Sequence, residues 1–99
     1  MKIHLPFLPR FREALLTDRK TKTCRTTRKA VAGDTFSAFG SIFLIEEVSK
    51  VRLGDVARLH YREEGLESPE AFILVWNSLH PSGYEPRKAV WLHQFRRLL

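Results

Sequence analysis

The fold is decided by the stretch GDTFSAFGSIFLIEEVSKVRL, residues 33–53. Its opening Gly-Asp pair is typical of a turn, and the β-branched and aromatic residues that follow favour strands over 35–39 and 41–45, hinged at Gly40. Polar and apolar side chains alternate again over 48–53, which predicts a further strand with one buried face. This region therefore indicates a β-hairpin or a bent strand, followed by another strand.

Three short helices are predicted around this region. Residues 8–16 have apolar side chains at helical spacing and a proline near the helix start. A second helix is predicted over 56–64, because a Gly-Asp pair before it provides a turn and an N-cap. The strongest helix signal lies over 68–79, where Ser68 is an N-cap candidate followed directly by a proline.

Two further strands are predicted near the ends of the chain. Residues 2–5 alternate between polar and apolar side chains, and residues 89–95 are rich in β formers. With the central region they predict an α+β, mainly β fold of about five strands and about three short helices. A length of 99 residues suits one hydrophobic core, so we expect a single domain over 1–99.

Composition excludes several classes of protein. No apolar run approaches the roughly 18 residues of a membrane-spanning helix, and none near the N-terminus has signal-peptide length. We therefore expect no membrane partner and a cytoplasmic location, with the chain a monomer or a weak homodimer. Cys24 is the single cysteine and the four histidines are far apart, so we expect no disulfide, no metal site and no cofactor.

Positive charge is concentrated in the first half of the chain. Residues 1–45 hold nine of the seventeen Lys and Arg but only three of the eleven acids, and six of those cations lie within 19–29. Threonines are interleaved with them, and this stretch contains no acid. Such a composition predicts anion binding, because Lys and Arg attract phosphate and threonine hydroxyls add donors. The alternative is a solvated basic loop that only aids solubility.

The candidate ligand-binding residues come from this basic run. They are Arg19, Lys20, Lys22, Thr23, Arg25, Arg28 and Lys29.

A second constellation joins the basic run to two acids further along the chain. Lys20 can deprotonate or orient the Thr23 hydroxyl, and either Glu63 or Glu64 can shuttle a proton if the fold brings it near. The alternative is an ordinary salt bridge that closes one end of a barrel. Cys24 also lies in the run, where neighbouring cations would lower its thiol pKa and make it reactive. Most lone cysteines are nevertheless inert, small apolar side chains, and this is what we expect of Cys24.

The pattern K-T-x-T-x-R occurs over Lys20 to Arg25, and Glu64 with Gly65 follows it downstream. Together with Gly33-Asp34, Phe72, Trp76 and the closing strand, this resembles the ASCH domain of the PUA-like superfamily over nearly the whole chain. The resemblance implies a small β-barrel with helices packed around it and a cleft at one end. One position departs from the pattern: Asp18 stands where the family commonly has a glycine. Aspartate tolerates some glycine-like backbone conformations, but it adds a negative charge beside the cleft.

The resemblance implies two functions. PUA-like domains are widely regarded as RNA-binding modules, so binding of RNA or of a nucleoside or nucleotide in the basic cleft is our first interpretation. One bacterial branch of similar size hydrolyses the acetyl amide of N4-acetylcytidine with a Lys, a Thr and a downstream Glu. In this chain the resemblance assigns Thr23 as nucleophile, Lys20 as its activator and Glu64 as proton shuttle, which makes an amidohydrolase the alternative.

Overall fold

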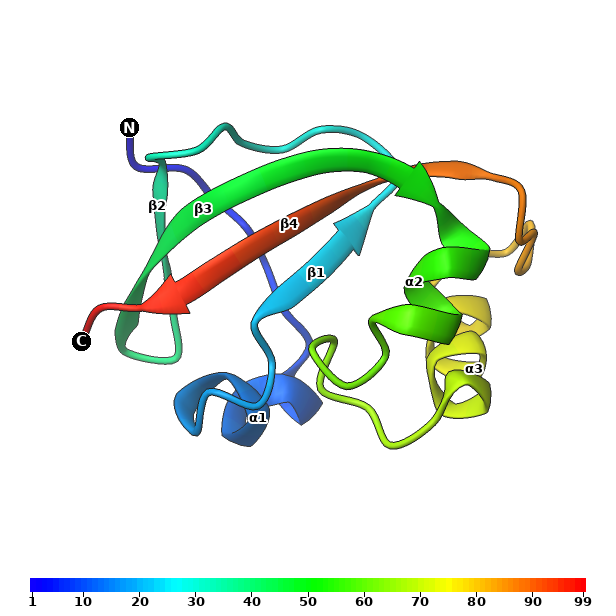
Figure 1. The fold of residues 1–99 in the computed structure, drawn as a ribbon. Helices are drawn as coiled ribbons and strands as arrows, with labels where there is room; N and C mark the ends of the chain where they lie inside the picture. The colour runs from blue at the N-terminus through cyan, green and yellow to red at the C-terminus, as the bar shows by residue number, and fades with distance from the viewer.

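The centre of the molecule is one curled antiparallel sheet, seen in a computed structural model that describes residues 1–99 (Figure 1). Neighbouring strands pair in the order β1-β4-β3-β2, so β1 and β2 are the two edges. The strands are β1 (Lys22–Arg25), β2 (Thr35–Ala38), β3 (Ser41–Arg52) and β4 (Ala89–Arg97).

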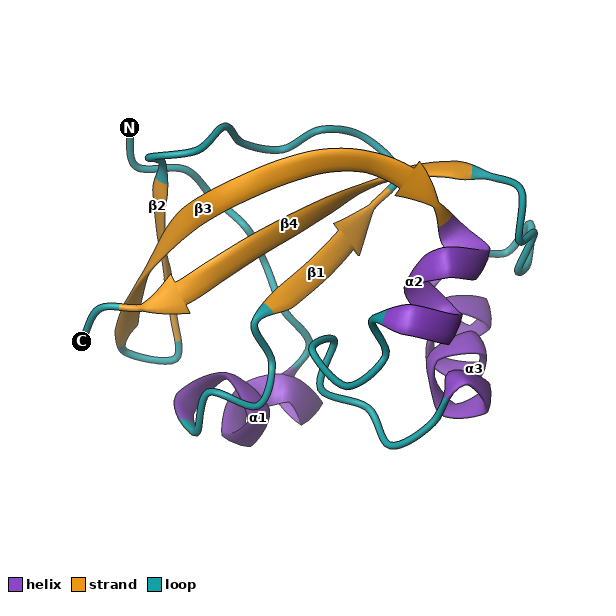
Figure 2. Ribbon diagram, in the orientation of Figure 1, coloured by secondary structure: helices purple, strands orange, loops and turns teal.

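Three α-helices accompany the sheet: α1 (Arg12–Leu16), which a 3₁₀ turn over Pro9–Phe11 precedes, α2 (Leu53–Leu59) and α3 (Pro69–Leu79). Figure 2 shows α2 and α3 packed together beyond the end of β3, whereas α1 lies near the start of β1. None of these helices combines the length and the apolar character that a membrane crossing requires.

The sheet separates two apolar clusters. One contains Phe36, Phe43 and Phe95 with residues of the N-terminal segment, and the other packs α2 and α3 against Val90 and Leu92. Successive side chains of a strand point to opposite faces, so β4 contributes to both clusters. The fold is therefore α+β and mainly β, with the sheet as the shared wall of two small cores.

The prediction of about five strands was wrong in two places. The opening stretch forms only a single bridge, from Lys2 to Thr35. The two strands expected over 41–45 and 48–53 are one strand, because a bulge between Ile45 and Glu47 shifts the register without ending the pairing. The closed barrel that the resemblance implies is also absent, since the four strands curl into a half-barrel.

The start of α3 is set by local sequence signals, whereas the start of α2 is set by tertiary contacts. The prediction for α3 is confirmed: the Ser68 hydroxyl accepts a hydrogen bond from Ala71 N at 3.0 Å and Pro69 begins the helix. The predicted boundaries of α2 were wrong. This helix begins at Leu53, because Leu53 N and the next amide donate to carbonyls of the loop before β4. The expected N-cap, Asp55, instead pairs with Arg58.

Candidate functional site

A pocket of about 360 Å³ opens beside β1, between the N-terminal segment and α3. Its apolar walls include Phe7 and Phe11 on one side and Phe72 and Trp76 on the other, and its polar groups come from the basic run and from the turn after α2. The predicted residues Lys20, Thr23, Arg25, Lys29 and Glu64 all line it. β1 is an edge strand, so no further strand pairs with its outer side.

The floor of the pocket is a buried ion pair between Lys20 and Glu64, whose side chains are 2% and 7% exposed. Lys20 Nζ donates three hydrogen bonds: to Glu64 Oε1 at 3.0 Å, to Glu64 O at 2.8 Å and to Lys22 O at 3.0 Å. It also lies 4.5 Å from the centroid of the Phe11 ring. An ammonium group has three donors and all three are used here, so this arrangement suits the charged form of Lys20.

Glu64 brings one unsatisfied atom to the site. Its Oε1 is paired, but its Oε2 is the one buried side-chain nitrogen or oxygen of the chain without a hydrogen-bond partner. Leaving such an atom unpaired costs free energy of about 1–3 kcal/mol, and more for a charged group. Glu64 Oε2 can therefore gain a partner from any N–H or O–H group that a ligand brings into the pocket.

The Glu64-Gly65 pair has a steric reason. Gly65 has a φ of +86°, and a Cβ atom placed there would lie 3.1 Å from Lys20 Cβ and 3.3 Å from Ala14 Cβ. The tight turn brings Glu64, and not Glu63, against Lys20. Glu63 contributes only its backbone carbonyl, which accepts hydrogen bonds from the amides of Thr21 and Lys22.

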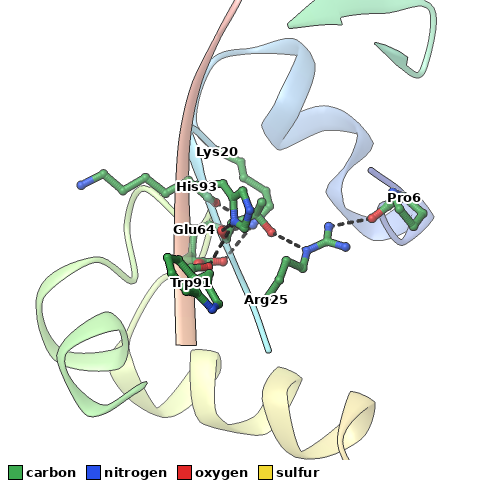
Figure 3. A network of polar contacts seen from close by, with 8 residues as sticks. Pro6, Lys20, Arg25, Glu64, Trp91 and His93 are labelled. Carbon is green, nitrogen blue, oxygen red and sulfur yellow. Dashed lines mark hydrogen bonds and ion pairs between the residues drawn. The ribbon is translucent and has the colours of Figure 1, made fainter. Parts of the chain in front are cut away.

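Thr23 and Arg25 form the second polar group of the pocket. Arg25 Nε donates to Thr23 Oγ1 at 3.3 Å, and its Nη2 donates to Pro6 O at 2.7 Å, which ties β1 to the N-terminal segment (Figure 3). The guanidinium lies 5.1 Å from the centroid of the Phe7 ring. Burial lowers the pKa of Arg25, which still remains charged at neutral pH. The Thr23 hydroxyl hydrogen and further Arg25 donors are left for a ligand.

The backbone of β1 adds a donor and an acceptor. Phe95 N donates to Thr21 O, and in an antiparallel pair such bonds recur at every second residue. The N–H and C=O of the residues between point outward, as Lys22 N shows by donating to Glu63 O. The same alternation turns the amide and carbonyl of Cys24 away from β4, toward the pocket that Cys24 lines.

The surroundings of Cys24 agree with the expectation of an inert side chain. Its side chain is largely buried and packs against the α2 and α3 cluster. Burial raises the pKa of the thiol strongly, the nearby Glu64 carboxylate raises it further, and the cations Lys20 and Arg25 offset only part of this. Cys24 is therefore a protonated, apolar wall of the pocket and not a nucleophile.

His93 holds the site together from behind. It is fully buried, its Nδ1 lies 3.3 Å from Thr23 O and 3.1 Å from Trp91 O, and its Nε2 accepts a hydrogen bond from Lys29 N at 3.1 Å (Figure 3). Two carbonyls at Nδ1 and a donor at Nε2 define the neutral ring protonated on Nδ1. Burial lowers the pKa of His93, because the charged form would lose its hydration; the cations Arg25 and Arg28 lower it further, and the hydrogen bonds to Thr23 O and Trp91 O offset part of this.

This environment predicts a pH-dependent stability. Below the unfolded pKa of about 6.5, the unfolded chain binds a proton at His93 that the folded chain resists. The free energy of unfolding should fall as the pH is lowered from 7 toward 5, by at most about 1.4 kcal/mol per pH unit from this group. Urea unfolding across that range should show a shallower fall in His93→Gln than in the wild type. His4→Gln, which replaces an exposed histidine, is the control; a fall in His93→Gln as steep as that in His4→Gln would contradict the assignment.

The rest of the basic run does not gather at the pocket. Arg19 pairs with Glu13 on α1, and Lys22 Nζ donates to His60 Nδ1 at 3.1 Å. Arg28 turns to Trp91, with its guanidinium 5.6 Å from the ring centroid. These three cations therefore lie on different surfaces: Arg19 precedes β1, Lys22 begins it and Arg28 follows it.

Asp18 does not bring its charge into the pocket. Its φ is +63°, so it adopts the glycine-like conformation, and its carboxylate binds Arg97 through two hydrogen bonds of 3.0 and 3.2 Å. These bonds lower the pKa of Asp18 and turn the group toward the end of β4.

Several lining residues carry no chemical motif. Phe7 and Phe11 reach the pocket only because the N-terminal segment folds back against β1. Phe72 and Trp76 are visible in the sequence as the apolar stripe of α3, which does not distinguish a pocket wall from core. No group of three or more His, Cys, Asp or Glu side chains comes together in a way that could hold a metal ion.

Comparison with known proteins shows similarity to solved structures but not to curated sequences. The chain matches no family model and no curated protein sequence. It superposes on the hypothetical protein PH0355 with a TM-score of 0.77, at 13% identity, covering 99% of this chain and 100% of that one. It also superposes on the ASCH domain from Lactobacillus crispatus JV V101 with a TM-score of 0.59, at 15% identity, covering 87% of this chain and 69% of that one.

The chain has the fold of an ASCH domain. A further structure, protein EF3133 from Enterococcus faecalis V583 of the family model DUF984, gives a TM-score of 0.66 at 16% identity over 90% of this chain and 67% of that one. In this chain the Lys20–Glu64 pair and the edge-strand residue Cys24 line one pocket.

Proposed function

We propose that this chain is an RNA- or nucleotide-binding module whose pocket beside β1 takes a nucleobase. The observation that carries the proposal is Glu64 Oε2, a buried acceptor without a partner that lies in a pocket with aromatic walls. The pocket volume, about 360 Å³, is in the range of small-molecule sites. The ASCH fold supports the same conclusion, because PUA-like domains are RNA-binding modules.

The polar groups favour a base over other planar ligands. A base edge presents N–H donors beside carbonyl or ring-nitrogen acceptors. Glu64 Oε2 accepts from the donor, while the Thr23 hydroxyl, Arg25 and the Cys24 amide supply donors for the acceptors. Phosphate has no N–H group, so it suits the cations near the mouth, Arg25 and Lys29, better than the floor.

The amidohydrolase alternative requires hydrogen bonds at Lys20 and Thr23 that differ from those observed. Thr23 would have to lose its proton to Lys20, but all three hydrogen bonds of Lys20 Nζ go to Glu64 and Lys22, and Thr23 Oγ1 instead accepts from Arg25. An ammonium held by three acceptors is a poor base. The geometry therefore favours binding without turnover.

The first test is binding across a range of salt concentrations. A labelled single-stranded RNA of about six nucleotides should bind, and three or four phosphate contacts imply a slope of log affinity against log salt of roughly −2 to −3. Fluorescence anisotropy measures this slope directly. Absence of binding at low salt, or a slope near zero, would remove the electrostatic part of the proposal.

The second test distinguishes binding from hydrolysis. Purified protein is incubated with N4-acetylcytidine, and acetate and cytidine are measured by chromatography. We expect binding without release of acetate. Release that Thr23→Val abolishes would replace the binding module with the hydrolase.

A further inference from the structure

Trp91 is the large aromatic side chain that neither apolar cluster nor the pocket uses. It lies on β4, half-buried, directly between Arg25 of β1 and Lys50 of β3 in the register of the sheet. Arg28 and Lys50 place their charged groups 5.6 and 5.9 Å from its ring centroid. A tryptophan has one of the largest apolar surfaces available to a small domain, so its position outside both clusters calls for a physical reason.

The surroundings of Trp91 are positively charged. Arg25 and Lys50 are its register partners, and Arg52 follows Lys50 by two residues, which places both on one face of β3. No acid occupies a register position beside Trp91 on β1 or β3. Arg28 and Lys50 are exposed. Arg28 Nε donates to Ala30 O at 3.1 Å, so its two Nη groups and the Lys50 ammonium are the donors for a phosphate beside the ring.

A continuous piece of chain connects Trp91 with the pocket. Arg25, Thr26 and Lys29 line the pocket, and Arg28, which lies between them in sequence, reaches Trp91. Hydrogen-bonded partners on neighbouring antiparallel strands have Cα atoms about 5.5 Å apart, so Arg25 and Trp91 are direct neighbours. His93 fixes this segment to β4 through the Lys29 amide.

We propose that Trp91, with Arg28 and Lys50, is a second stacking site for a single-stranded RNA whose other base occupies the pocket. The strand leaves the pocket, crosses residues 25–29 and stacks a neighbouring base on the indole. Stacking on aromatic side chains and a cationic groove for the backbone are the two elements of single-strand binding. This inference rests on the proposed function, and it names a strand, not a free nucleotide, as the partner.

NMR of the two tryptophan indole N–H groups tests the proposal in the wild-type chain. The signals of Trp76, which lines the pocket, and Trp91 are assigned by their presence or loss in Trp91→Phe. Nucleoside monophosphates carrying each of the four bases should shift the Trp76 signal alone, whereas single-stranded RNA of about six nucleotides should shift both. A Trp91 signal that the RNA leaves unmoved overturns the inference while the pocket proposal stands, and a shift of Trp91 alone refutes the pocket instead.

Variants give the second readout. Trp91→Ala should weaken RNA binding about fivefold or more without changing mononucleotide affinity, and Trp91→Phe should restore most of the loss. The double variant Arg28→Ala with Lys50→Ala should make the salt slope shallower by about 1.4, for two phosphate contacts on a single strand. The control, Lys2→Ala with Arg12→Ala, removes the same charge elsewhere and should keep the slope. Equal effects of the two double variants, or binding to anionic lipid vesicles or an acidic peptide that competes with RNA, would overturn the inference.

Discussion

Lys20→Met is expected to lower the free energy of unfolding by about 3–5 kcal/mol, because it leaves the Glu64 carboxylate buried without its partner. Urea unfolding followed by circular dichroism measures the loss. The double variant Lys20→Met with Glu64→Leu removes both charges, so its loss should be well below the sum of the two single losses.

An exposed ion pair provides the control. Arg97→Met removes the cation that binds Asp18 at the surface, where solvent screens the pair and its loss should change the free energy of unfolding little. If Lys20→Met and Arg97→Met lower the free energy of unfolding by the same amount, the buried Lys20–Glu64 pair does not stabilise the pocket as described.

Arg25→Ala should weaken nucleotide and RNA binding by about tenfold or more, the usual size of a lost hydrogen bond to a charged group. Arg25 lines the pocket, contacts the Thr23 hydroxyl and holds Pro6 O, so its removal deletes donors and loosens one wall. Arg25→Lys should recover only part of the affinity, because lysine cannot reproduce the planar set of donors. Isothermal titration calorimetry measures all three affinities.

The matched control is Arg19→Ala, which removes the same charge from the same basic run. Arg19 is exposed, pairs with Glu13 and does not line the pocket. We expect an affinity change below about threefold, which is within the range of a single surface charge. A loss equal to that of Arg25→Ala would mean that net charge alone attracts the ligand.

Elements with complete local signals could be predicted from the sequence. The cap, the following proline and the apolar stripe of α3 lie within one segment, and β4 is one run of β formers. β3 could not be predicted as a single strand, because the bulge that joins its halves depends on pairing with β4. The start of α2 depends on carbonyls of a loop more than thirty residues away.

Some residues of the candidate site could likewise be predicted from the sequence, and others could not. Lys20, Thr23, Arg25 and Glu64 could be selected by residue type and by resemblance, and the structure brings them to one pocket. The surroundings of Cys24 and the complete burial of His93 could not be predicted from the sequence, because both result from packing across the sheet. Trp91 carries no motif, and only the strand register places it between cations.

The most direct test of the central claim is a crystal structure of the protein soaked with a nucleoside monophosphate. The account predicts the base between the Phe7 and Phe11 wall and the Phe72 and Trp76 wall, with an N–H group within hydrogen-bond distance of Glu64 Oε2 and the phosphate near Arg25 or Lys29. Glu64 Oε2 still without a partner, with the base bound on another surface, would contradict it.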